Sequence, residues 1–213
     1  LVIPDVDPLE IIKELAKRNP IDNAFVWFII WRGFPPSGNP RDLENCPVNF
    51  AMYIKPSYPI ASTPLVRLYL DKQTNRVNDD YYGQEYKNMA WIDLTLSQRN
   101  TPAGFDTTVL VDVDGFVTEG PGFNVGIVKD GVIKTADKNV LKGITMSVVE
   151  DIAKENNITF KRMPITQQMF LSADEVFITS SSGGVTPTTV TGEITNLLVS
   201  QYKDKKEQYG TLL

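Results

Sequence analysis

Two Asp-Gly pairs, each set between apolar stretches, constrain the fold of this chain more than any other feature. The stretch VLVDVDGFVTE turns at Asp114-Gly115, and the stretch VGIVKDGVIKT turns at Asp130-Gly131. An Asp-Gly pair between apolar strands is a strong indication of a β-hairpin. The middle of the chain is therefore predicted to form antiparallel hairpins, at a place where a βαβ protein would have crossover helices.

Helical and strand patterns surround these hairpins and predict a mixed α/β (α+β) fold. Helices are predicted over 7–19, 86–100, 143–157, 165–174 and 193–210, and further strands over 21–33, 47–56, 65–70, 158–165 and 175–181. The strand over 21–33 is predicted to be buried. Two prolines in SYPIASTP indicate an interdomain linker over 57–64, which separates a domain over 1–56 from a larger one over 65–213.

Charge, hydropathy and cysteine content exclude several classes of partner. The net charge of −5, without a basic stripe, argues against a nucleic-acid partner. The longest apolar run, AFVWFII over residues 24–30, is too short to span a bilayer. Cys46 is the only cysteine, so no internal disulfide can form and a reduced, cytoplasmic location is predicted.

The chain contains no histidine, which excludes much of the usual chemistry of enzymes. A Ser-His-Asp or Cys-His pair, a histidine general base and a zinc site with imidazole ligands are all impossible, and no metal site is predicted. If the chain is an enzyme, a lysine, a carboxylate, a tyrosine or a cofactor must carry protons.

A carboxylate in the stretch TEGPGFN lies between two strands that are predicted to be buried. Glu119 runs directly into Gly120, Pro121 and Gly122. A buried carboxylate requires a positive partner or several hydrogen-bond donors. Either Glu119 binds a cationic group of a ligand that approaches the glycine backbone, or it accepts hydrogen bonds from nearby amides.

Three further segments offer groups that could bind such a ligand. Lys87 stands at the start of the predicted helix over 86–100, where a desolvated amine would be a nucleophile toward carbonyls, although a surface lysine is the simpler alternative. The stretch GIT over 143–145 opens a helix and offers free amides and a hydroxyl, unless Thr145 only caps the helix. The stretch SSSGGV over 180–185 could hold a phosphate or form a flexible turn.

An amine, a carboxylate and two anion sites together match one class of ligand. Pyridoxal 5'-phosphate has an aldehyde for a lysine, a ring nitrogen for an acid, and a phosphate for helix and loop amides. A carboxylate beside the ring nitrogen would keep it protonated, and the lysine could carry the proton without any histidine.

Over residues 86–190 the chain resembles the class IV aminotransferases, the fold-type IV pyridoxal-phosphate enzymes. The matching stretches are YKNMAWIDL, VLVDVDGFVTEGPGFNVGIVKDGVIKT, NVLKGIT and SADEVFITSSSGGVTP. Within this family, YKNMAWIDL and TEGPGFN look closest to the R-selective amine transaminases. The resemblance implies a two-domain fold, pyridoxal 5'-phosphate as cofactor, an amine or amino acid and a keto acid as substrates, and a homodimer.

The resemblance also implies a role for each matching residue. Lys87 corresponds to the Schiff-base lysine, and Glu119 to the acid that pairs with the pyridine nitrogen of the cofactor. The remaining cofactor-binding residues are Leu141, which packs on the ring, and Gly143, Ile144, Thr145, Ser180 and Ser181, which bind the phosphate.

Some features depart from the family pattern and keep alternatives open. Met146 stands where an arginine is usual, and Pro121 replaces a usual serine. The chain begins at Leu1 rather than methionine, so we expect a truncated small N-terminal domain in front of the large C-terminal one. The alternatives are a branched-chain or D-amino-acid aminotransferase, an aminodeoxychorismate-type lyase, and an inactive fragment that serves as a binding or dimerisation module.

Overall fold

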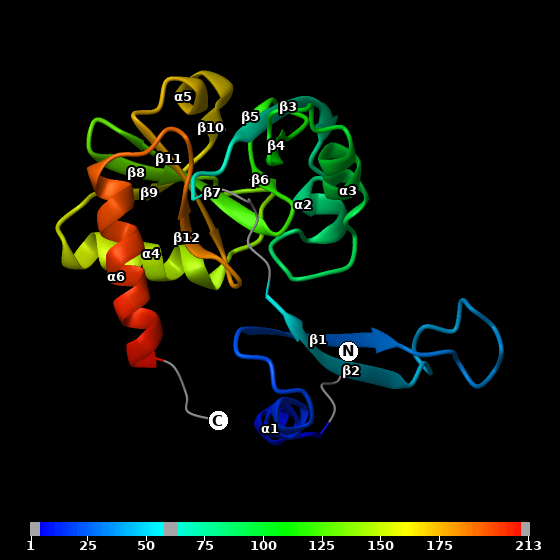
Figure 1. Cartoon of the computed structure of the whole chain (residues 1–213). Coiled ribbons are helices and arrows are strands. Elements are labelled where there is room, and N and C mark those ends of the chain that lie inside the picture. Colours follow the sequence, from blue (N-terminus) through cyan, green and yellow to red (C-terminus); the bar gives the residue numbers. More distant parts are fainter. Residues whose placement is uncertain (1–4, 58–63, 210–213) are drawn as a thin grey trace. The chain divides into compact units, whose positions relative to one another are not determined.

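The computed structural model describes residues 5–57 and 64–209, and the chain divides into two compact units (Figure 1). Of the described residues, 5–57 belong to the first unit and 64–209 to the second. Most of the linker predicted over 57–64 lies outside the described residues, so that boundary stays a prediction.

The described part of the first unit consists of one helix and a two-stranded antiparallel sheet. Helix α1 (Pro8–Arg18) begins after Asp7, whose carboxylate accepts a hydrogen bond from the amide of Leu9 at 2.9 Å, as its sequence predicts. Strand β1 (Ala24–Arg32) pairs in register with β2 (Val48–Pro56). The prediction that the strand over 21–33 is buried is wrong, because two strands and one helix cannot cover both faces of the sheet.

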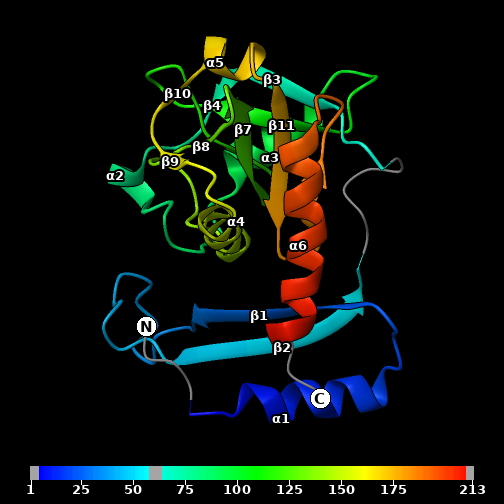
Figure 2. The same ribbon diagram turned by 90° about the vertical axis from the view of Figure 1, so that its left-hand side faces the viewer.

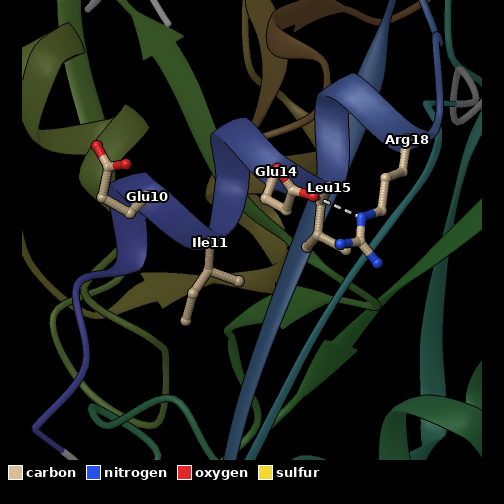
Figure 3. A pocket seen from close by; sticks show the side chains of 5 residues that line it. All are labelled: Glu10, Ile11, Glu14, Leu15 and Arg18. Atoms are coloured by element: carbon tan, nitrogen blue, oxygen red, sulfur yellow. Dashed lines mark hydrogen bonds and ion pairs between the residues drawn. The ribbon is translucent and has the colours of Figure 1, made fainter.

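A shallow depression on α1 is lined by residues of that helix alone, namely Glu10, Ile11, Glu14, Leu15 and Arg18 (Figure 3). Within it, Nε of Arg18 donates a hydrogen bond to Oε1 of Glu14 at 2.6 Å. Because this pair is exposed and its two charges neutralise each other, the depression offers no group that is poised for chemistry.

The second unit contains two sheets. The four-stranded sheet has the order β10-β5-β4-β3, formed by β10 (Ile165–Thr166), β5 (Phe116–Val117), β4 (Thr107–Val111) and β3 (Leu68–Asn75). The six-stranded sheet has the order β12-β11-β7-β8-β9, formed by β12 (Gly184–Pro187), β11 (Glu175–Ser180), β7 (Phe123–Lys129), β8 (Val132–Thr135) and β9 (Phe160–Arg162). Its sixth strand, β6 (Glu119–Gly120), pairs with β7. Only β3 with β4 and β8 with β9 are parallel pairs among these ladders.

Two apolar clusters form the core of the second unit and define its layers. One cluster lies between the sheets and includes Leu70, Val109 and Val117 from the smaller sheet and Val125, Ile127 and Ile178 from the larger one. The other joins the opposite face of the larger sheet to α4 (Ile144–Glu155) and α6 (Glu193–Tyr209), which lie on the same side of that sheet (Figures 1 and 2). Both faces of β11 are therefore covered, and all its residues are buried.

Both predicted Asp-Gly hairpins are confirmed. Between β7 and β8, Asp130 and Gly131 have φ angles of 52° and 72°, and a tight hairpin turn of the I′ type requires positive φ at both positions. Between β4 and β5 the turn is wider, because Oδ1 of Asp112 accepts hydrogen bonds from the amides of Asp114 and Phe116.

The helices predicted over 143–157, 165–174 and 193–210 are confirmed as α4, α5 (Gln167–Leu171) and α6. The helix predicted over 86–100 begins later, as α3 (Ile92–Arg99), because the Asn88 side chain accepts a hydrogen bond from the amide of Ala90 and forms a local turn instead. The polar stretch before it contains the end of β3 and a short helix, α2 (Asp79–Tyr82). None of the described helices is long and apolar enough to cross a membrane.

Candidate functional site

The positive partner of Glu119 in this structure is an arginine, Arg76. Oε1 of Glu119 accepts hydrogen bonds from Nε of Arg76 at 3.1 Å and from Nη2 at 2.9 Å. Glu119 and Arg76 are only 5% and 4% exposed, so water screens this pair very little. The sequence left open a cationic group of a ligand or nearby amides as the partner of this acid, and the resemblance implied the pyridine nitrogen of a cofactor. Arg76 was not among the predicted partners.

The second carboxylate oxygen of Glu119 is held by neutral donors. Oε2 accepts hydrogen bonds from the amide of Leu141 at 3.0 Å and from Nδ2 of Asn124 at 3.3 Å. Burial raises the pKa of Glu119, while Arg76, the Leu141 amide and the charge of Lys87 act in the opposite direction. Glu119 is therefore fixed in one orientation. The longest of its hydrogen bonds is the one that Oε2 accepts from Asn124.

Arg76 is shared between two carboxylates. Its Nη1 donates to Oδ2 of Asp93 at 2.6 Å, and its Nη2 donates to Oε1 of Gln84 at 2.6 Å. Asp93 belongs to the first turn of α3, and its Oδ2 also accepts a hydrogen bond from the amide of Val77 at 2.9 Å. The cluster of Arg76, Asp93 and Glu119 contains two acids and one base, so with both acids ionised it carries a net charge of −1.

Lys87 lies in an irregular segment between α2 and α3, not at the start of a helix as predicted. Its side chain is exposed, and among the described residues no carboxylate lies within ion-pair distance of its amine. It is nevertheless close enough for its positive charge to lower the pKa of Glu119. The predicted nucleophile, Lys87, therefore lies near enough to the predicted acid, Glu119, for their charges to interact.

Two residue pairs connect α2 and the segment that carries Lys87 to the loop before α4. The amide of Asp79 donates to Oδ1 of Asn139 at 2.9 Å, and the amide of Asn139 donates back to Oδ2 of Asp79 at 2.6 Å. Nearer to Lys87, Nζ of Lys142 pairs with Oε2 of Glu85 at 2.6 Å. The loop that supplies the Leu141 amide to Glu119 is therefore also attached to the lysine segment.

The start of α4 presents donors without partners. The N-cap residue Gly143 has no side chain that could cap the helix, and among the described contacts no carbonyl accepts from the amides of Ile144 or Thr145. Thr145 does not cap the helix, which removes the simpler alternative for this motif. Thr145 is 5% exposed and Ile144 is 81% exposed, so the threonine faces inward and the isoleucine faces outward. Free amides at a helix N-terminus favour an anion.

The stretch 180–185 forms the tight turn between β11 and β12 rather than an open loop. Ser180 is opposite Gly184 in the ladder, and its hydroxyl accepts a hydrogen bond from the amide of Gly183 at 2.9 Å. Ser181 is exposed in this turn. Helix α4 contacts both strands, and its first turn lies beside this turn in Figure 1. The two predicted anion-binding segments are therefore neighbours.

The sequence pattern missed several residues of this site, namely Arg76, Gln84, Asp93 and Asn124. Strand β12 was also missed, because SSSGGV was interpreted as a phosphate-binding stretch or a flexible turn. Gly122 has a φ of 86°, which turns β6 back onto β7 and places Asn124 opposite Glu119. The acid is therefore presented by a paired strand, which holds it more firmly than a loop would.

Comparisons with known proteins agree with this arrangement. The family model for amino-transferase class IV matches residues 4–190. A "Putative branched-chain-amino-acid aminotransferase" of Methanocaldococcus jannaschii is 30% identical over 216 residues, which cover 95% of this chain and 74% of that protein. A D-alanine aminotransferase of Staphylococcus epidermidis is 27% identical over 193 residues, which cover 85% of this chain and 64% of that protein.

Solved structures show the same fold. The branched-chain aminotransferase of Thermoproteus uzoniensis with norvaline superposes with a TM-score of 0.82 at 22% identity, covering 94% of this chain and 72% of that one. An aminotransferase of Brucella abortus bound to the cofactor PLP superposes with a TM-score of 0.81 at 19% identity, covering 97% of this chain and 78% of that one. The relatives carry branched-chain and D-alanine names, so the predicted closeness to R-selective amine transaminases stays a prediction.

Proposed function

The chain belongs to the class IV aminotransferase family, and on this premise we propose that Pro59–Gly210 binds pyridoxal 5'-phosphate with Lys87 as its covalent attachment site. The observation that supports this most is the buried carboxylate of Glu119 within electrostatic reach of an exposed lysine amine. Among the described residues no carboxylate forms an ion pair with Lys87, so its amine is available to a ligand near Glu119.

The residues present fit this cofactor on three counts. With both acids ionised, the cluster of Arg76, Asp93 and Glu119 has one negative charge in excess, which suits a protonated ring nitrogen. The first turn of α4 offers amides that have no acceptor among the described residues, which suit a phosphate. The Thr145 hydroxyl makes no hydrogen bond among the described residues and can donate to the same phosphate.

When bound, pyridoxal 5'-phosphate supplies an electron-withdrawing ring that stabilises negative charge at the substrate carbon. Oε2 of Glu119 would accept a hydrogen bond from the protonated ring nitrogen and so favour the protonated form of the ring. Leu141 positions this oxygen through its amide, and its side chain would pack on the ring. Nζ of Lys87 accepts the proton that leaves the substrate carbon, since the chain has no histidine to do so.

The phosphate is proposed to lie between the start of α4 and the β11–β12 turn. Gly143, Ile144 and Thr145 would contribute from the helix, and Ser180 and Ser181 from the turn. Because the Ser180 hydroxyl already accepts a hydrogen bond from Gly183, it can still donate its own proton to a phosphate oxygen.

The proposed substrates are an amino acid or amine and a keto acid, which agrees with the names of the relatives. A homodimer and a cytoplasmic location stay predictions.

Borohydride reduction of the full chain with pyridoxal 5'-phosphate, followed by peptide mass mapping, tests the attachment site. Reduction makes a lysine–cofactor link permanent, so a pyridoxyl group is expected on the peptide that contains Lys87. Lys142→Ala is the matched control, because Lys142 lies in the neighbouring loop and pairs with Glu85 instead. The label should survive in Lys142→Ala and disappear in Lys87→Ala.

A label on another lysine, or no label on folded protein, would refute the assignment of Lys87. Glu119→Gln is the companion variant for the role of the acid. It should retain the label on Lys87 but remove the proton from the substrate more slowly, and unchanged turnover would contradict the role of Glu119 at the ring.

A further inference from the structure

We propose that Arg76 is a positioning residue that keeps Glu119 ionised and aimed at the ring nitrogen, and that Asp93 and Gln84 hold Arg76 for this purpose. The inference rests on the proposed function, because it concerns the acid that binds the cofactor ring. It assigns a task to three buried residues that the proposed chemistry does not otherwise use.

The hydrogen bonds of Arg76 leave its guanidinium no freedom to turn. Nε and Nη2 both donate to Glu119, Nη1 donates to Asp93, and Nη2 also donates to Gln84. The three partners come from β6, from α3 and from the segment after α2. A planar fork with several donors can satisfy partners in three directions, whereas the single ammonium of a lysine cannot.

Burial creates the need for such a residue. It favours the neutral form of Glu119, and a neutral carboxyl group would not stabilise a proton on the ring nitrogen. Arg76 opposes burial from the Oε1 side, while Oε2 keeps only the two neutral donors from Leu141 and Asn124. One oxygen is thus used to maintain the charge, and the other remains for the ligand.

Asp93 makes the position of Arg76 beside Glu119 compatible with the binding of a protonated ring by Glu119. An unbalanced guanidinium would repel a protonated ring. Asp93 lies 2.6 Å from Nη1 and is 4% exposed, so its charge offsets that of Arg76 almost without screening. The charged groups that face Glu119 are then Arg76, Asp93 behind it, and Lys87.

The test compares the affinity for pyridoxal 5'-phosphate with that for an analogue in which a carbon replaces the ring nitrogen. Both are measured by equilibrium dialysis on the full chain. The preference for the native cofactor should fall roughly tenfold, or about 1.4 kcal/mol, in Arg76→Lys. Glu119→Gln should lose the same preference, and adding Arg76→Lys to it should cause little further loss.

The control is Arg67→Lys, because Arg67 also donates through Nε and Nη2 to one carboxylate, that of Asp106, but is half-exposed on the surface. It should keep the full preference for the native cofactor. Asp93→Asn, which conserves shape, provides a second variant if Arg76→Lys does not fold, and it should also reduce the preference.

Two results overturn the inference. One is an equal loss of affinity for both ligands in Arg76→Lys, which would mean that Arg76 only supports the fold. The other is that Arg76→Lys reduces the preference for the native cofactor as much in the Glu119→Gln variant as in the wild-type chain. Failure of the proposed function is a separate outcome, because the wild-type chain would then bind neither ligand and show no label on Lys87.

Discussion

Replacement of Gly143 by alanine is expected to disrupt the hydrogen bonds that Asn124 makes around Glu119. Gly143 has φ −67° and ψ 133°, which alanine adopts without strain. The obstacle is steric, since a Cβ at this position would overlap Oδ1 of Asn124 and lie 3.2 Å from its Cγ. Asn124 is 8% exposed, so its amide can move away only by giving up its partners.

Those partners set the magnitude. Nδ2 of Asn124 donates to Oε2 of Glu119 at 3.3 Å and to the carbonyl of Leu141 at 2.7 Å. A hydrogen bond to a charged group contributes about 1.5–3 kcal/mol and a neutral one about 0.5–1.5 kcal/mol, and the longer bond belongs at the lower end. The expected loss is therefore about 2–3 kcal/mol, or roughly 4–12 °C in Tm for a chain of this size.

Calorimetry of Gly143→Ala, Asn124→Ala and the double variant tests this reasoning. Once Asn124 is truncated the obstacle is gone, so Gly143→Ala should then cost no more than about 1 kcal/mol, as expected for alanine at an N-cap. The coupling between the two sites should be about 2 kcal/mol. Equal losses from Gly143→Ala in both backgrounds would refute the steric account.

Further predictions concern the rest of the second unit. Although burial alone would raise it, the Ser97 hydroxyl and two backbone amides hold the pKa of Asp71 below its ordinary value. The ionised Asp71 therefore stabilises the fold above the unfolded pKa of ~3.9, and this stabilisation is lost as the pH falls through the folded pKa. In urea titrations, the difference in free energy of unfolding between wild type and Asp71→Asn should become smaller in acid. Gly126→Ala places a Cβ 2.6 Å and 2.7 Å from ring carbons of Phe177 and should cost about 1–3 kcal/mol in urea unfolding, of which Phe177→Leu restores part. Leu198→Ala, at a position that is 0% exposed, should cost about 2–5 kcal/mol in the same assay, and a smaller loss would show that the site collapses around the gap.

The parts of the fold that depend on neighbours in the chain were predictable. The Asp-Gly hairpins are specified by two residues each, and α4 by its apolar periodicity and its glycine start. The burial of Glu119 also followed from its flanking strands. The start of α3 was not predictable from periodicity, because a local hydrogen bond of Asn88 competes with the helix.

The partner of Glu119 could not be found in the sequence for a different reason. Arg76 lies in the polar stretch DKQTNRVNDDYYGQE, which is typical of a solvated segment. It becomes buried only because β3 pairs in parallel with β4, which brings its backbone amide within 2.7 Å of the carbonyl of Val111. A one-dimensional pattern does not contain this pairing. The only available sign was an unpaired acid that needed a cation.

The hydrogen bonds of Glu119 also order events during folding. Its donors Arg76 and Leu141 lie 43 residues before it and 22 residues after it in the chain. Both loops must close before the carboxylate is satisfied, and loop closure costs entropy before its contacts form. The site therefore assembles after the local hairpins, and substitutions within it should speed unfolding far more than they slow folding. The binding site would therefore form after the local hairpins of the second unit and be lost before them.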